Sequence, residues 1–247
     1  MKKLLQLVVG ILYFVSFGLL DGETLRVMVF APHQDDDVIG CGGSIAMHVK
    51  NNHDVTIVYM TSDMGSKKCM RKYGKDGVKK VRDAEARQAA DVLGVKKLIF
   101  LNCDDNFIKH TLEDTQKIVE ILSQLLHDTK PHVVYIPHKH DNHPDHMLTY
   151  DLVMQAREKA KNWLVPTVLC YEIWRPIHRV SYKENISDYI NLKITAIQKH
   201  QSQLEEMRFD DAIKGLNQYR AIMFHQGLYC ECFEFIGIRQ EFMKNIT

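Results

Sequence analysis

Short apolar runs alternate with longer amphipathic segments along most of this chain. The apolar runs are six or seven residues long and rich in valine, isoleucine and tyrosine, as buried strands are. They cover residues 25–31, 55–61, 97–102, 132–137 and 167–173. Between them lie segments with the apolar period of a helix, at residues 43–51, 79–93, 112–128 and 147–161.

This alternation of strand and helix predicts an α/β fold. Parallel neighbouring strands need a long crossover connection, which is usually helical and right-handed. We therefore expect a Rossmann-like, mostly parallel sheet with helices on both faces. No repeat and no linker rich in proline, glycine or serine interrupts residues 23–247, so we expect a single domain there.

The part of the chain after residue 190 predicts two more helices and an apolar tail. One helix carries Lys193, Ala196, Ile197 and His200, the second covers residues 210–223, and the tail covers 232–238. Two readings stay open here. These elements either close one side of a functional site or simply complete the sheet and the helices that cover it.

The chain begins with the pattern of a targeting segment. Lys2 and Lys3 precede an uncharged apolar run at residues 4–20. Such a run predicts a signal peptide or membrane anchor over residues 1–22, although about 17 residues is at the lower limit for a membrane span. The two lysines place the rest of the chain outside the cytoplasm, exported or attached to a membrane through residues 4–20.

The six cysteines argue against export to an oxidising compartment. They form no C-x-x-C pair, and Cys41, Cys103, Cys170 and Cys230 lie in or beside apolar runs. Cysteines in such positions behave as small buried hydrophobic residues rather than as disulfide partners. A cytoplasmic location is therefore the alternative to export.

The charge balance narrows the class of partner. The chain has 32 basic and 31 acidic residues, a formal net charge of +1. A protein that binds nucleic acid through phosphate contacts usually carries a large positive excess. We therefore expect a small-molecule substrate and no nucleic acid; the oligomeric state is not predicted.

Two clusters of polar residues follow two of the apolar runs. Residues 33–37 read H-Q-D-D-D after the first run, and residues 138–146 read H-K-H-D-N-H-P-D-H after the fourth. In α/β sheets, ligand and catalytic residues gather at the carboxyl ends of the strands. Imidazole and carboxylate groups from two strand ends predict one divalent metal site.

His33, Asp36 and His146 are the expected metal ligands. His33 and Asp36 are three residues apart on one turn, so both can converge on one ion, and His146 arrives from the second cluster. Three protein ligands leave a coordination position open for water, as in catalytic zinc sites. Zinc is the expected metal, with iron(II) or another divalent ion as the alternative.

The remaining cluster residues suit hydrolysis of an amide. Asp35 lies beside the expected ion without being needed as a ligand, so it suits a general base. His143, one helical turn before His146, can face the same cavity and protonate the leaving amine. Asp145 is expected to orient His143 through a hydrogen bond.

Two other cofactor chemistries compete with this interpretation. Gly40, Gly42 and Gly43 do not have the G-x-G-x-x-G spacing of a dinucleotide loop and follow acidic residues, so we expect no nucleotide cofactor. An iron(II) oxygenase is a second alternative, because His33, Asp35 and His146 also fit an H-x-D…H pattern. Oxygenases of that kind use antiparallel barrels, which the alternation of strand and helix disfavours.

The motifs resemble those of the PIG-L/LmbE-like family of metal-dependent de-N-acetylases. The family's first motif usually reads A-H-P-D-D-E, and residues 32–37 of this chain read P-H-Q-D-D-D. Gln34 replaces the usual proline, and Asp37 replaces the usual glutamate. The family's H-P-D-H motif stands intact at residues 143–146. Residues 193–203, K-I-T-A-I-Q-K-H-Q-S-Q, are similar to a late family helix.

The resemblance implies the same assignments as the residues themselves, with zinc bound by His33, Asp36 and His146. It further implies that Arg82 contacts the acyl group or an anion of the substrate. The implied activity is zinc-dependent removal of the N-acetyl group from an N-acetylglucosamine-type glycoconjugate. A carbohydrate-binding relative that has lost catalysis is the alternative from another class, and the rest of the conjugate is not specified.

Overall fold

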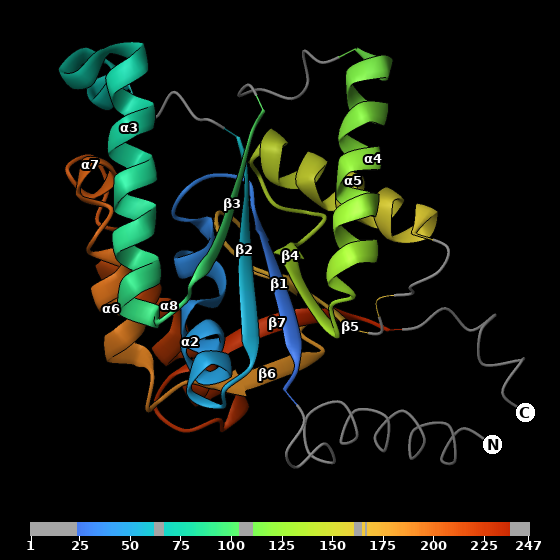
Figure 1. Cartoon of the computed structure of the whole chain (residues 1–247). Coiled ribbons are helices and arrows are strands. Elements are labelled where there is room, and N and C mark those ends of the chain that lie inside the picture. Colours follow the sequence, from blue (N-terminus) through green and yellow to red (C-terminus); the bar gives the residue numbers. More distant parts are fainter. Residues whose placement is uncertain (1–23, 62–66, 104–110, 161–164, 166, 238–247) are drawn as a thin grey trace, which may run out of the picture.

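The fold is built on one seven-stranded sheet with the strand order β3-β2-β1-β4-β5-β7-β6 (Figure 1). The computed structural model describes residues 24–61, 67–103, 111–160, 165 and 167–237. The strands are β1 (Arg26–Ala31), β2 (Asp54–Thr61), β3 (Lys97–Cys103), β4 (Val133–Pro137), β5 (Thr167–Tyr171), β6 (Tyr182–Asn185) and β7 (Cys230–Ile236).

Helices cover both faces of this sheet, as predicted. Figure 1 shows α4 and α5 on one side and α2, α3, α6 and α8 on the other. Their bounds are α2 (Asp36–Lys50), α3 (Lys67–Leu93), α4 (Leu112–Thr129), α5 (Pro144–Lys159), α6 (Ile190–Ile197), α7 (Gln201–Leu204) and α8 (Phe209–Phe224). The expected Rossmann-like α/β architecture is confirmed.

Alternate residues of the strands supply two separate cores. In β1, Val27 and Val29 belong to the core shared with α2, α3, α6 and α8, whereas Met28 and Phe30 belong to the core shared with α4 and α5. All four side chains are completely buried. Because both faces of the strand are covered, its sequence is continuously apolar rather than alternating.

Pairing within the sheet is mostly parallel. β1 pairs in parallel with β2 and β4, β2 with β3, and β4 with β5. The C-terminal strand β7 runs antiparallel to β5, and the short β6 runs antiparallel to β7. The sequence placed the first five strands correctly but gave the apolar tail no strand assignment and missed β6.

The path of the chain creates a crevice between β1 and β4. From β1 the chain builds outward through β2 to β3, and it then returns to the other side of β1 to form β4. Neighbouring connections leave these two strands in opposite directions, which opens space at their carboxyl ends. The two polar clusters of the sequence directly follow these two strands.

The predicted leader, residues 1–22, lies outside the described residues, so its role stays a prediction. Within the described part of the chain, the helices do not combine the length and the hydrophobicity that a membrane span needs. The cysteines in the described part are free, and Cys41, Cys170 and Cys230 are buried as expected, whereas Cys103 is partly exposed.

Candidate metal centre and active site

The first cluster forms a tight turn between β1 and α2. Asp36 is the first residue of α2, and its Oδ2 accepts the backbone N–H of His33 at 2.9 Å. The same Oδ2 lies 3.1 Å from Nδ1 of His33. The spacing of three residues therefore closes the turn and brings an imidazole and a carboxylate to one point.

The second cluster forms the beginning of α5. His143 is the N-cap residue, and its Nδ1 accepts the backbone N–H of Asp145 at 3.2 Å. Pro144 occupies the first helical position, where the absence of an N–H costs nothing. His146 follows within the first turn and is completely buried. The H-P-D-H motif is thus a helix start that projects two imidazoles to one side, with ring centroids 4.7 Å apart.

His33, Asp36 and His146 come together as predicted. Oδ2 of Asp36 lies 3.1 Å from Nδ1 of His33 and 3.2 Å from Nε2 of His146, and the two nitrogens are 3.3 Å apart. Donors around one ion at about 2.1 Å lie roughly 3.0 Å apart in octahedral and roughly 3.4 Å apart in tetrahedral coordination. The three atoms therefore fit a single divalent metal.

His143 is close to the same point. Ligand atoms of His33, His143 and His146 all lie within 4.8 Å of one another. Its Nδ1 is engaged by the backbone of α5, so Nε2 is the atom that remains for the cavity. The donor atoms of the Asp36-containing set are closer together, so this set is the better candidate for a metal site.

In each expected histidine ligand, a second carboxylate lies beside the ring nitrogen that does not face Asp36. Oδ2 of Asp145 is 3.2 Å from Nε2 of His33, and Oδ1 of Asp141 is 3.1 Å from Nδ1 of His146. Carboxylates in this position orient metal-binding histidines and fix their tautomers. The sequence did not identify Asp141. It also paired Asp145 with His143, but that side-chain distance is 3.9 Å, so the carboxylate contacts His33 more closely.

The electrostatics of the three donors favour a cation. Burial lowers the pKa of His33, but hydrogen bonds to Asp145 and Asp36 raise it to about 10. Burial likewise opposes the charged form of Asp36, yet His146 and His33 hold its pKa well below the usual range. Asp36 and Asp141 raise the pKa of His146 against the effect of burial. The carboxylates therefore stabilise positive charge where the donor atoms meet.

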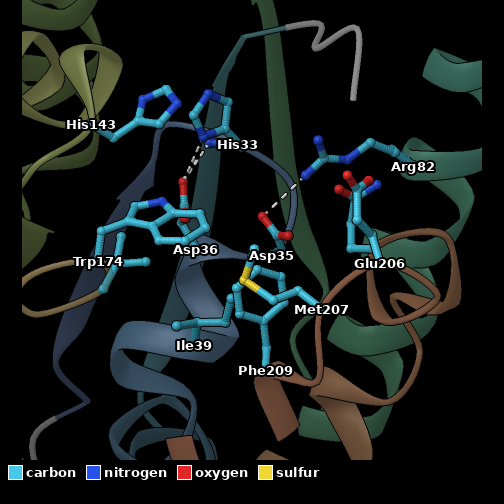
Figure 2. A pocket seen from close by; sticks show the side chains of 12 residues that line it. His33, Asp35, Asp36, Ile39, Arg82, His143, Trp174, Glu206, Met207 and Phe209 are labelled. Atoms are coloured by element: carbon cyan, nitrogen blue, oxygen red, sulfur yellow. Dashed lines mark hydrogen bonds and ion pairs between the residues drawn. The ribbon is translucent and has the colours of Figure 1, made fainter. Parts of the chain in front are cut away.

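The expected donor atoms of His33, Asp36 and His146 are called the donor triangle below. Asp35 lies beside it and is held by Arg82. The guanidinium donates from Nη2 to Oδ1 of Asp35 at 3.0 Å and to the carbonyl oxygen of Gln34 at 3.1 Å. Burial raises the pKa of Asp35 to about 6, against the opposing effect of the Arg82 charge. Figure 2 shows this pair across the cavity from His33 and Asp36. An oxygenase-type triad would need Asp35 as the ligand, but Asp36 is the carboxylate that lies against His33 and His146.

The two departures from the family motif lie behind the site. Gln34 donates from Nε2 to Oδ1 of Asp83 at 2.9 Å. Oδ2 of Asp37 accepts the hydroxyl of Tyr59 at 3.1 Å, and burial raises the pKa of Asp37 to about 7. Neither side chain lines the cavity, so the departures leave the proposed ligands and the base unchanged.

A cavity of about 260 Å³ opens over the donor triangle. Its polar side is lined by His33, Asp35, Asp36, Arg82, His143, Gln203 and Glu206. Its apolar side is lined by Ile39, Ile173, Trp174, Met207 and Phe209. Most of the apolar side was not predicted from the sequence, because its residues come from separate segments and share no motif.

The late helix motif is mainly structural. Nζ of Lys193 lies 2.6 Å from Oε1 of Glu231, and both side chains are completely buried. The backbone N–H and the hydroxyl of Ser202 both donate to the carboxylate of Glu85 at 2.7 Å. Of the motif residues, Gln203 lines the cavity. The C-terminal region therefore does both things that the sequence left open: it completes the fold and closes one side of the site.

The fold and the site define an α/β protein with a candidate mononuclear metal centre at the carboxyl ends of its central strands. Residues 28–157 match the family model PIG-L, described as GlcNAc-PI de-N-acetylase. This match covers more than half of the 247 residues. The chain belongs to the PIG-L family.

Three curated relatives of this chain are named as deacetylases. The uncharacterized deacetylase YaiS of Escherichia coli (strain K12) is 28% identical over 181 residues, which are 71% of this chain and 90% of that protein. The probable N-acetyl-alpha-D-glucosaminyl L-malate deacetylase 2 of Bacillus subtilis is 24% identical over 83% of this chain and 96% of its own. The diacetylchitobiose deacetylase of Thermococcus kodakarensis is 26% identical over 74% and 72%, respectively.

Solved structures share the fold. The conserved protein TT1542 of Thermus thermophilus superposes with a TM-score of 0.72 at 27% identity, over 85% of this chain and 94% of that one. The 4-carboxy-2-hydroxymuconate hydratase GalB gives a TM-score of 0.75 at 21% identity, over 87% and 98%. Because this fold also carries a hydratase, the reaction has to be argued from the site.

Proposed function

We propose that this chain is a metal-dependent hydrolase that removes the N-acetyl group from an N-acetylglucosamine-type conjugate. The observation that carries the proposal is the donor triangle of His33, Asp36 and His146, with Asp35 and His143 lining the same cavity. The names of two relatives support the substrate class, because one is named a probable N-acetyl-alpha-D-glucosaminyl L-malate deacetylase and the other a diacetylchitobiose deacetylase.

His33, Asp36 and His146 would hold the metal, and Asp145 and Asp141 would keep the two imidazoles oriented. A divalent metal bound there polarises an amide carbonyl and lowers the pKa of a coordinated water. Zinc and iron(II) both accept this set of two histidines and one carboxylate, so the donors alone do not select between them.

Asp35 supplies the general base. Its carboxylate is ionised above a pH of about 6, and the hydrogen bond from Arg82 to Oδ1 fixes its orientation. The positive charge of Arg82 opposes the effect of burial, because a nearby cation favours the carboxylate form of Asp35. Asp35 takes the proton from the water that attacks the carbonyl carbon, and this proton is needed later at the leaving nitrogen.

His143 supplies the donor on the other side of the reacting amide. Since Nδ1 accepts the N–H of Asp145, the ring carries its hydrogen on Nε2, which is the free atom. Burial and the neighbouring His33 and His146 lower the pKa of His143, which favours this neutral form of the ring. Its Nε2–H donates to the developing oxyanion. The proton that Asp35 took from the water passes to the nitrogen as the C–N bond breaks. The products are acetate and the free amino sugar.

Acetate release from a panel of N-acetylglucosamine conjugates tests this proposal. We expect the metal-loaded full chain to release acetate and Asp35→Asn to lose about 10²-fold or more of that rate, on the order of the contribution of general base catalysis. Asp188→Asn, at an exposed position, is the matched control and should keep the rate. Equal release by Asp35→Asn would contradict the assigned base; no release from any conjugate would favour a binding role.

A further inference from the structure

The cavity has an outer part that the proposed chemistry does not use. We name it the outer subsite and define it by Trp174, Glu206, Met207 and Phe209. The rings of Trp174 and Phe209 meet edge to face, with centroids 5.6 Å apart and planes at 80°. Trp174 is 44% exposed and Met207 is 45% exposed, so a broad apolar surface faces solvent at the mouth of the cavity. Figure 2 shows the indole on the opposite side of the cavity from Glu206 and Arg82.

The indole of Trp174 is carried by a loop that is fixed at several points. Its backbone N–H donates to Oδ2 of Asp141 at 3.1 Å, and Oδ1 of the same carboxylate lies beside His146. Further along the loop, the N–H of Ile177 donates to Oε2 of Glu172 at 2.7 Å, and Arg220 forms a buried ion pair with that carboxylate. An aromatic surface held in this way binds a flat ligand without the cost of ordering the loop.

The charge at the mouth is acidic. The side chain of Glu206 is exposed and has no hydrogen-bond or ion-pair partner among the described residues. Lys72 forms an ion pair with Glu205, Lys68 donates to the backbone carbonyl of Glu205, and Arg82 forms an ion pair with Asp35. A carboxylate or phosphate placed directly against the Glu206 side chain would be repelled by its negative charge, whereas a hydroxyl could donate a hydrogen bond to it.

We propose that the outer subsite binds an uncharged ring attached to the N-acetylglucosamine unit, so that the substrate class is a neutral glycan or aryl glycoside. The proposal rests on the deacetylase function argued above. The C–H face of a pyranose is apolar and packs on an indole, while its hydroxyls donate to a carboxylate such as Glu206. Trp174 and Glu206 are thus specificity-determining residues, and an acceptor that carries a carboxylate is disfavoured.

Paired binding measurements test the proposal. Metal-loaded Asp35→Asn is titrated by calorimetry with phenyl N-acetylglucosaminide as the neutral probe and N-acetylglucosaminyl malate as the anionic probe. We expect the phenyl glycoside to bind at least tenfold more tightly. Trp174→Ala should lower its affinity about tenfold, Trp174→Phe should restore part of it, and Glu206→Gln should improve binding of the malate conjugate alone. Tyr219→Ala, an exposed aromatic position on α8, is the matched control and should leave both affinities unchanged.

Fluorescence adds a direct readout of stacking. The chain has two tryptophans, so a Trp163→Phe background leaves Trp174 as the reporter. Quenching by the phenyl glycoside supports the stacking. Equal or tighter binding of the malate conjugate, no binding of either probe, or no effect of Trp174→Ala would overturn the proposal.

The two proposals fail in different ways. If wild type releases no acetate but the phenyl glycoside binds in a Trp174-dependent manner, the deacetylase function is wrong and the subsite stands. If both conjugates are deacetylated with equal kcat/KM and Trp174→Ala changes neither value, the function stands and the subsite is wrong.

Discussion

Oδ1 of Asp141 lies 3.1 Å from Nδ1 of His146, on the side of the ring opposite the expected metal. The same buried carboxylate accepts the backbone N–H of His143 at 3.0 Å and that of Trp174 at 3.1 Å. One side chain therefore contacts an expected metal ligand, fixes the start of the helix that carries it, and holds the loop of the outer subsite.

Replacing Asp141 with asparagine should weaken metal binding. The amide cannot supply the negative charge that orients the imidazole and increases its basicity, and changes of this kind typically cost about 10–100-fold in metal affinity. Competition with a chelator measures the effect. Asp151→Asn, at an exposed position on the same helix as His146, is the matched control. Unchanged affinity in Asp141→Asn would remove Asp141 from the metal centre.

The buried ion pair between Lys193 and Glu231 should matter more for stability than an exposed pair. Glu231 also accepts the backbone N–H groups of Gly43 and Ser44, each at 2.8 Å, close to the point where α2 departs from helical geometry. Lys193→Met leaves this carboxylate buried without its cation, which should cost about 3–5 kcal/mol of unfolding free energy.

The same substitution at Lys97 is the control, because its pair with Asp54 is exposed and should contribute only about 0–1 kcal/mol. Urea unfolding of both variants supplies the comparison. Equal losses at the two lysines would show that the buried pair has no special role.

Gly40 is required by a close approach between α2 and β5. A Cβ at this position would lie 2.1 Å from Cδ2 of Tyr171, whose hydroxyl donates to the carbonyl of Phe30 at 2.7 Å and so fixes the ring. Gly40→Ala should therefore destabilise the fold by about 1–3 kcal/mol. In α8, a Cβ on Gly215 would meet nothing within 4 Å, so Gly215→Ala should stabilise by about 0.5–1 kcal/mol. Thermal unfolding of the two variants distinguishes packing from helix propensity.

His48 should make stability depend on pH. Burial, with a smaller effect of His53, lowers the pKa of His48 from 6.5 to about 3. Between these values the unfolded chain binds a proton that the folded chain does not, so the stability falls as the pH falls below 6.5. His48→Gln should flatten this dependence by up to about 1.4 kcal/mol per pH unit. The exposed His178→Gln should follow wild type; an identical slope in His48→Gln would contradict a neutral buried imidazole.

The sequence predicted the central sheet better than the ends of its elements. The first five strands are buried on both faces, so their apolar runs mark them directly. The helix expected from residue 43 begins instead at Asp36, because Gly40 and Gly43 pack against Tyr171 and Ile186 despite their low helix propensity. β6 reads Tyr-Lys-Glu-Asn, an edge strand with no apolar pattern to mark it.

The candidate site was predictable only as far as local motifs reach. His33 and Asp36 lie within one turn, and His143 and His146 lie within another, so short sequence patterns identify them. Asp141 belongs to the same cluster, but its role depends on the fold of the loop after β5, which carries Trp174. Residues at such loop contacts share neither spacing nor periodicity, and their juxtaposition becomes visible only in three dimensions.

The most direct test of the central claim follows acetate release during metal titration. Protein freed of metal by a chelator receives increasing amounts of Zn²⁺ and, in parallel, Fe²⁺, while bound metal and acetate release from N-acetylglucosamine conjugates are measured together. We expect release to rise with the first equivalent of metal and Asp36→Asn to lose both metal binding and release. Release at full rate without metal, or one bound equivalent with no release from any conjugate, would contradict it.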